Sequence, residues 1–143
     1  MGYYIDQIDH NFKIKKENIQ KAWDSLLDIM KLENKTIHDS SGYHFSRIDT
    51  DVVLNAETFE KALSEARFDI ETDNSGDVIH IYFNGEKLGD EEIILSSIAP
   101  YVENGSYITF QGEEGERWKW KFVGGILEEI NGHWVFDDEE IKD

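Results

Sequence analysis

Arg117-Trp118-Lys119-Trp120-Lys121-Phe122 is the clearest indication of fold in this chain. Aromatic and basic residues alternate in it, and a period of two is typical of a β-strand with one buried face. We expect the aromatic rings to cover the core and the cations to lie on the solvent face, where they would pair with Glu128 or Glu129. An interpretation of the aromatic side chains as a binding surface stays open, because Trp and Tyr dominate interaction hot spots.

This strand is part of a β-meander that we expect in the C-terminal part of the chain. The predicted strands are 106–111, 116–123, 126–130 and 133–136. Gly124-Gly125 and Asn131-Gly132 separate the last of these strands. Both are two-residue turns of the kind that hairpins need, because Gly and Asn tolerate positive φ. The acidic tail at 137–143 is expected to fray.

Helix and strand patterns share the rest of the chain. The predicted elements are a strand at 3–14, a helix at 15–32, a helix after the N-cap Asn55, a hairpin of 68–71 and 78–84, and a helix after the N-cap Asp90. In the helix at 15–32, an apolar stripe with helical spacing includes Ile19, Trp23 and Leu26. Residues 33–54 show no sustained period, so they are predicted to form a long loop.

These elements predict an α+β fold with a mostly antiparallel sheet and helices on one face. The order is that of a ferredoxin-like β-α-β-β-α-β unit, extended by the C-terminal β-meander. A chain of 143 residues is the length of one domain, so we expect a single domain over residues 1–143.

Charge is distributed unevenly along the chain. The net charge is −17, and residues 1–67 carry 12 Asp and Glu against 9 Lys and Arg. Residues 68–143 carry the other 19 acidic residues against 5 basic ones. Such an excess disfavours binding to nucleic acid or an anionic membrane and favours a protein partner with a basic or nucleic-acid-binding surface. No membrane-spanning run or secretory signal is apparent, which predicts a cytoplasmic protein.

Acidic residues gather within the meander and supply the candidate partner-binding residues. These are Glu113, Glu114, Glu116, Glu128 and Glu129. Carboxylates spread over a rigid sheet would imitate the phosphates of a nucleic-acid duplex. The hypothesis is a non-enzymatic interaction protein that occupies the nucleic-acid channel of another protein. An edge strand of the meander also makes a homodimer conceivable.

A different class of function stays open for the 33–54 loop. Its candidate site residues for a small ligand or an enzymatic reaction are His38, Tyr43, His44 and Arg47. Long loops inside compact domains are often functional. No catalytic, cofactor or metal motif is predicted. Asp73, Ser75 and Asp77 imitate a calcium loop, but Val78 stands where Gly is needed and Asn84 where Glu is needed.

The second half of the chain resembles a group of small acidic proteins of bacteria and their phages. The resemblance rests on Gly85-Glu86-Lys87-Leu88-Gly89-Asp90-Glu91-Glu92, Ala99-Pro100-Tyr101-Val102, Gly105-Ser106-Tyr107-Ile108 and Gly112-Glu113-Glu114-Gly115-Glu116-Arg117-Trp118-Lys119-Trp120. The group carries no activity that transfers to particular residues. What the resemblance implies is an inhibitor of a host defence nuclease, of the anti-restriction or anti-CRISPR type.

Overall fold

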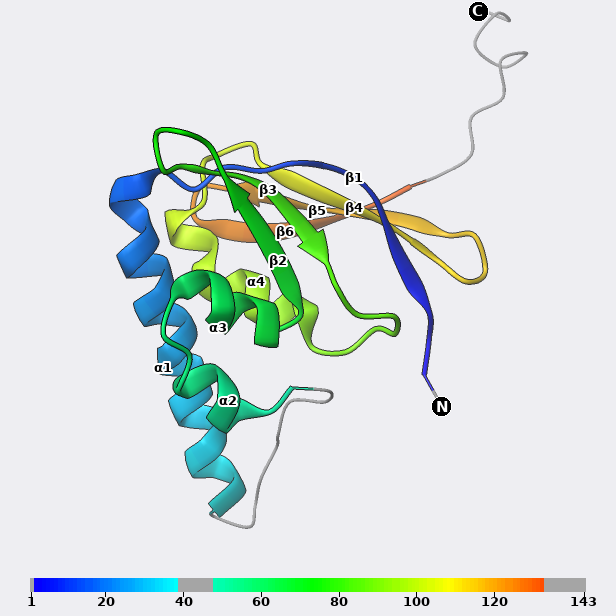
Figure 1. Cartoon of the computed structure of the whole chain (residues 1–143). Coiled ribbons are helices and arrows are strands. Elements are labelled where there is room, and N and C mark those ends of the chain that lie inside the picture. Colours follow the sequence, from blue (N-terminus) through cyan, green and yellow to red (C-terminus); the bar gives the residue numbers. More distant parts are fainter. Residues whose placement is uncertain (1, 39–47, 133–143) are drawn as a thin grey trace, which may run out of the picture.

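The computed structural model describes residues 2–38 and 48–132, with side chains described outside 33–38 (Figure 1). Within these ranges the chain forms four α-helices and six strands, which confirms the α+β class. In chain order they are β1 (Ile5–Asn11), α1 (Ile19–His38), α2 (Thr50–Leu54), α3 (Phe59–Glu65), β2 (Phe68–Thr72), β3 (Val78–Phe83), α4 (Glu91–Ile98), β4 (Tyr107–Gly112), β5 (Arg117–Val123) and β6 (Ile126–Asn131). Short 3-10 turns at Lys16–Asn18 and Ala99–Tyr101 precede α1 and follow α4.

The strands form two antiparallel units. One is a sheet in the order β1-β4-β5-β6, and the other is the hairpin β2-β3. The hairpin lies beside β1, and isolated antiparallel bridges at the two ends of β1 join its flanking residues to the hairpin side, Tyr4 to Lys87 and Ile14 to Val78. The ferredoxin-like order is not confirmed, because no continuous hydrogen-bonded ladder connects β1 to β3.

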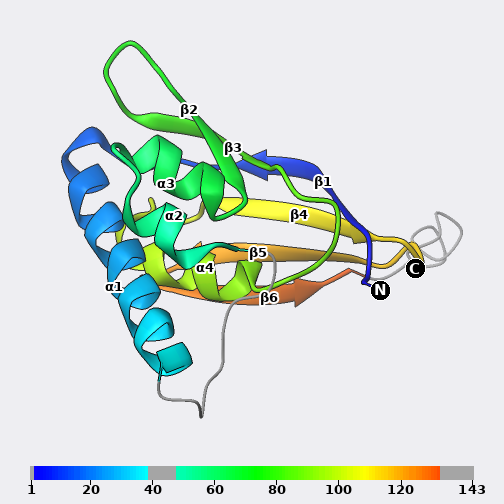
Figure 2. The ribbon, with the colours of Figure 1, turned by 60° about the horizontal axis from the view of Figure 1, so that its bottom comes forward.

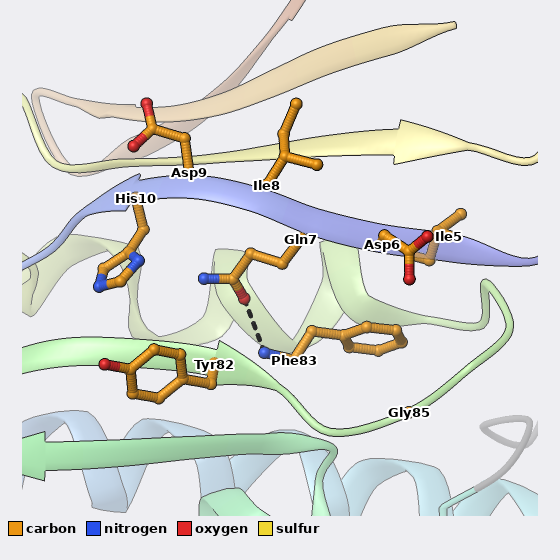
Figure 3. Close-up of a pocket in the computed structure, with 9 residues that line it drawn as sticks. All are labelled: Ile5, Asp6, Gln7, Ile8, Asp9, His10, Tyr82, Phe83 and Gly85. Carbon is orange, nitrogen blue, oxygen red and sulfur yellow. Dashed lines mark hydrogen bonds between the residues drawn. The ribbon is translucent and has the colours of Figure 1, made fainter. Parts of the chain in front are cut away.

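A glutamine side chain spans the gap between β1 and β3 (Figure 3). The amide Nε2 of Gln7 donates to the carbonyl oxygen of Ile81 at 2.7 Å, and the backbone N–H of Phe83 donates to Gln7 Oε1 at 2.7 Å. Directly after Gln7, the pairing of β1 with β4 shifts register. The Gln7 amide therefore takes the place of a peptide group where the two strands separate.

All four described helices lie on one face of the sheet (Figure 2). On the predicted stripe of α1, Leu26 and Met30 are buried, and Ile19 and Trp23 are partly buried against the core. Ala22, which was not part of that prediction, is buried as well, and the buried core includes Trp120 and Phe122 of β5. The aromatic face of β5 is thus the core face, as the alternation indicates. In the described ranges no helix is both long and apolar enough to cross a membrane.

The predicted 33–54 loop is shorter in the structure. α1 continues to His38, and Thr50–Leu54 forms α2, which begins because the carboxylate of Asp49 accepts from the N–H of Asp51. Asn55 is the C-cap of α2, so its prediction as the N-cap of α3 is wrong. Thr58 has that role, since its hydroxyl accepts from the N–H of Lys61. The predicted strand at 133–136 and the tail at 137–143 lie outside the described residues.

Candidate binding cavity

The alternation of β6 places two of the predicted acidic residues on opposite faces. Glu129 pairs with Trp120 across the strands, and Glu128 pairs with Lys121. Directly opposed residues share a face in an antiparallel sheet. Glu129 therefore lies on the inner face with the aromatic rings, whereas Glu128 lies on the outer face with the lysines.

The β4–β5 turn carries the other three predicted residues and bonds to the N-terminal segment. The backbone N–H of Tyr4 donates to Glu113 Oε1 at 3.0 Å, and the Tyr3 hydroxyl donates to Glu116 Oε2. The backbone N–H of Glu114 in turn donates to the Tyr3 hydroxyl at 3.3 Å. Partial burial and the bond to Glu116 raise the pKa of Tyr3 above its ordinary value. Tyr3 and Glu116 are thus held in place, and the side chain of Glu114 is exposed.

A cavity of about 290 Å³ opens on the inner face, between β5–β6, the β4–β5 turn and the segment that leads into α4. Its described lining residues are Tyr3, Leu88, Gly89, Glu92, Glu116, Trp118, Trp120, Glu129 and Asn131. The three carboxylates come from α4, from the β4–β5 turn and from β6. Segments that are distant in the sequence therefore place negative charge around one hollow.

Two indoles form the aromatic wall of this cavity. The ring centroids of Trp118 and Trp120 lie 6.1 Å apart at an interplanar angle of 64°. Trp120 is 3% exposed, and its Nε1–H donates to Glu129 Oε1 at 3.0 Å. The Nε1–H of Trp118 is buried and has no hydrogen-bond partner in the described part of the chain. The wall thus combines indole rings with an oriented carboxylate.

The segment before α4 is fixed from both sides. The backbone N–H of Leu88 donates to the carbonyl oxygen of Tyr3 at 2.7 Å, and that of Gly89 donates to Glu91 Oε1 at 2.6 Å. Glu91 is fully buried, and its burial raises the pKa of the carboxyl above the ordinary value. The next residue, Glu92, is exposed at the cavity. Because Glu92 follows the buried Glu91 in α4, the packing of Glu91 fixes the position of Glu92 at the cavity.

The cations of β5 lie away from the cavity. Arg117 donates from Nε to Gln111 Oε1 at 2.8 Å, and Lys119 Nζ lies 4.1 Å from the ring centroid of Tyr107. Among the described residues that line the cavity there is no Lys, Arg or His. Its carboxylates are consequently not neutralised by neighbouring side chains of that lining.

A second, larger hollow of about 490 Å³ lies over the gap between β1 and β3 (Figure 3). Its described lining residues are Ile5, Asp6, Gln7, Ile8, Asp9, His10, Tyr82, Phe83 and Gly85. His10 Nε2 lies 2.9 Å from His80 Nδ1, and the Tyr82 hydroxyl donates to Glu71 at 3.0 Å. Burial, followed by the charge of His80, lowers the pKa of His10. Gln7, His10 and Tyr82 thus already use polar groups within the fold, so this hollow is less suited to binding than the acidic cavity.

The alternative loop site falls outside what the structure describes. Tyr43, His44 and Arg47 lie in the residues that are not described, and His38 ends α1 without a described side chain. In the described ranges no group of three or more His, Cys, Asp or Glu side chains is arranged to hold a metal ion.

Comparison of the chain with known protein families, curated proteins and solved structures finds no match. The chemistry of the cavity therefore follows from its own lining residues. The sequence indicated Glu116 and Glu129 but missed Tyr3, Glu92 and Asn131. The acidic run Asp90-Glu91-Glu92 was a visible signal. For Tyr3 there was none, because only the fold places the N-terminal segment beside the β4–β5 turn.

Proposed function

We propose that this chain is a non-enzymatic interaction protein that binds a basic segment of a partner protein at the acidic cavity. The observation that carries the proposal is that Glu92, Glu116 and Glu129 surround one cavity whose described lining has no cation. Exposed Glu113 and Glu114 lie beside it on the β4–β5 turn. Like charges gathered at one place raise the local potential, and an oppositely charged partner is attracted to it over a Debye length of about 10 Å.

The partner that fits this charge is a protein that itself binds nucleic acid. Such proteins present Lys and Arg side chains at the spacing of phosphates, and the net charge of −17 repels nucleic acid itself. The resemblance to small acidic phage proteins adds a biological setting, in which the partner is a host defence nuclease. A duplex DNA added in competition should then displace this protein from its partner.

The binding proposal is tested with an arginine-rich peptide and fluorescence anisotropy. Glu92 and Glu114 make no hydrogen bond with their side chains in the described part of the chain, so Glu92→Gln/Glu114→Gln should fold normally. We expect this variant to bind the peptide about two- to tenfold more weakly. A matched control, Glu17→Gln/Glu60→Gln, removes the same charge from exposed positions before α1 and in α3. Equal losses in both variants would mean that only net charge matters, which contradicts a site at the cavity.

The defence-inhibitor setting is tested in cells. Expression of the chain in bacteria that carry a restriction or CRISPR nuclease should raise the plating efficiency of a targeted phage. Glu92→Gln/Glu114→Gln should raise it less than the Glu17→Gln/Glu60→Gln control does. If the plating efficiency is unchanged with every nuclease tested, the role as an inhibitor of host defence is rejected. The proposal of a basic partner protein is then unaffected.

Homodimerisation through β6 is disfavoured by the charge of that strand. β6 is the last strand of the described sheet, and Glu128 and Glu129 stand at its centre. Antiparallel pairing of two such strands about a twofold axis would place carboxylates opposite one another, which is destabilising. A partner with basic residues on its edge strand would meet no such repulsion.

A further inference from the structure

The acidic cavity combines the two features that proteins use to bind an organic cation. Trp118 and Trp120 both line it, and because Trp120 is 3% exposed, the half-buried Trp118 is the indole that a cation in the cavity would meet. Indole is the strongest cation–π partner among the side chains. Because the carboxylates share the same hollow, the attraction of this indole and that of the charges add at one point.

The carboxylates are oriented before a ligand arrives. Glu116 is held by the Tyr3 hydroxyl through Oε2, and Glu129 by Trp120 Nε1 through Oε1. Each keeps its second oxygen for another donor. Glu92 has neither a hydrogen bond nor an ion pair within the described residues, so both of its oxygens are available. Pre-oriented acceptors lower the entropy that binding would otherwise cost.

We propose that the cavity takes the side chain of a single arginine of the partner, with its guanidinium between the indole of Trp118 and the carboxylates. This proposal rests on the proposed function, since it names the group through which the basic partner is recognised. A guanidinium is flat, stacks on aromatic rings and offers five N–H donors in one plane. Carboxylates on different walls, from Glu92, Glu116 and Glu129, can each accept from a different edge of it.

Lysine fits the same cavity less well. Its ammonium is a compact and strongly hydrated charge with three donors, and it cannot stack as a plane on an indole. The planar guanidinium therefore matches the cavity better than the ammonium does.

The test uses the full chain and three capped amino acids. The probes are N-acetyl-arginine amide, N-acetyl-lysine amide and N-acetyl-citrulline amide, the last being uncharged and close to arginine in shape. Binding is followed by the ¹H–¹⁵N indole resonances of Trp118 and Trp120, with Trp23 of α1 as the internal reference. We expect saturable shifts of the two cavity resonances with arginine, weaker ones with lysine and none with citrulline.

Two variants locate the binding. Glu92→Gln removes a cavity carboxylate that has no partner in the described chain, and we expect about tenfold weaker binding of the arginine probe. Glu128→Gln removes the same charge from the outer face of β6 and should leave the affinity within about twofold, because Glu128 is exposed on the other side of the sheet and its charge is screened by salt. Equal losses in the two variants, or shifts with citrulline, would overturn the proposal.

An arginine-rich peptide titrated into the same samples separates this proposal from the one on which it rests. If the peptide binds but the capped arginine does not shift the cavity indoles, the basic-partner function stands and the arginine site is wrong. If neither binds, the proposed function fails with it. If lysine binds as tightly as arginine, the cavity recognises charge alone and the guanidinium assignment is overturned.

Discussion

Arg67 and Glu91 form a buried ion pair in which Nη1 and Oε2 lie 3.2 Å apart. Both side chains are nearly inaccessible to solvent, at 7% and 0% exposure. Arg67 also donates to the carbonyl oxygen of Lys87, and its guanidinium lies 5.0 Å from the ring centroid of Phe83. Arg67 thus connects the chain after α3 both to the first residue of α4 and to the segment before α4, which forms one wall of the acidic cavity.

Loss of either charge should destabilise the protein more than loss of both. Glu91→Leu leaves the guanidinium of Arg67 buried without its carboxylate, and we expect the free energy of unfolding to fall by about 3–5 kcal/mol. Arg67→Met/Glu91→Leu removes both charges and should recover a large part of that loss. Urea denaturation of the wild type, both single variants and the double variant measures the coupling. A double variant no more stable than Glu91→Leu would show that the ion pair is not the source of the effect.

The same pair explains why residue 85 is a glycine. A Cβ atom built on Gly85 would overlap the guanidinium of Arg67, although the φ angle of Gly85 is one that other residues adopt. Gly85→Ala should therefore displace Arg67 from Glu91 and lower stability by about 1–3 kcal/mol, the usual cost of an overpacked core. Gly105 serves as a control for space, since a Cβ there meets nothing within 4 Å and only its φ of 92° opposes Ala.

The comparison of these two variants is made by thermal unfolding. In the Arg67→Met background, where the guanidinium is absent, the cost of Gly85→Ala should become smaller. The cost of Gly105→Ala should stay the same in both backgrounds, because Gly105 has no neighbour to move. Equal costs of Gly85→Ala with and without Arg67 would contradict the steric explanation.

Stability should depend on pH through His10. Burial and the charge of His80 lower the pKa of His10 in the fold, against Asp9 and Glu71, which raise it. The unfolded chain, with an ordinary pKa of about 6.5, then binds more protons than the fold. The contribution of His10 is therefore fully present above about pH 6.5 and is lost as the pH falls through that value toward the lower pKa of the fold.

Denaturation midpoints measured between about pH 5 and 8 check this dependence. The wild type should lose more stability toward low pH than His10→Gln, which has no imidazole at that position. Carboxylates titrate in both proteins, so their effect cancels in the difference. Parallel curves for the two proteins would remove His10 as the cause.

Local patterns in the sequence were enough to predict most of the secondary structure. The alternation in β5 predicted its buried face, and the Gly124-Gly125 turn has the positive φ angles that its hairpin requires, 60° and 83°. The end of α1 was missed because residues 33–38 have no apolar stripe, and the helix continues through local hydrogen bonding. The N-cap of α3 was misplaced because Asn55 and Thr58 are both good caps, and which one is used depends on packing.

The cavity was only partly predictable, for a tertiary reason. Glu116 directly precedes β5 and Glu129 lies in β6, so their acidic pattern was visible around one hairpin. Tyr3 and Glu92 reach the cavity through the pairing of β1 with β4 and through the buried Arg67–Glu91 pair, and no local period encodes either contact. The positive φ of Arg67, at 86°, was equally invisible, because nothing in the sequence predicts a non-glycine residue there.

Mutations should distinguish the residues of the meander that stabilise the fold from those that bind the partner. Trp120 is 3% exposed and packs against Phe110 with ring centroids 5.1 Å apart, so Trp120→Ala should cost about 3–5 kcal/mol through the cavity that it leaves. That is a large share of the roughly 5–15 kcal/mol by which domains are stable, so urea denaturation should show a large shift or an unfolded chain.

Glu114→Lys changes an exposed turn residue and should leave stability within about 0.5 kcal/mol. Glu113→Lys should cost somewhat more, about 0.5–1.5 kcal/mol, because Glu113 accepts a bond from the Tyr4 N–H.

Among the variants that fold, loss of binding of the arginine-rich peptide should not follow loss of stability. Glu114→Lys adds a positive charge beside the cavity and should weaken the peptide severalfold without loss of stability, because the surface potential that attracts the peptide is reduced. A Trp120→Phe variant keeps most of the buried ring but loses the Nε1–H bond to Glu129, so it should fold while Glu129 is less well oriented. If Trp120→Ala remained as stable as the wild type while peptide binding disappeared, the aromatic rings would be the recognition surface and the sheet would draw its stability from elsewhere.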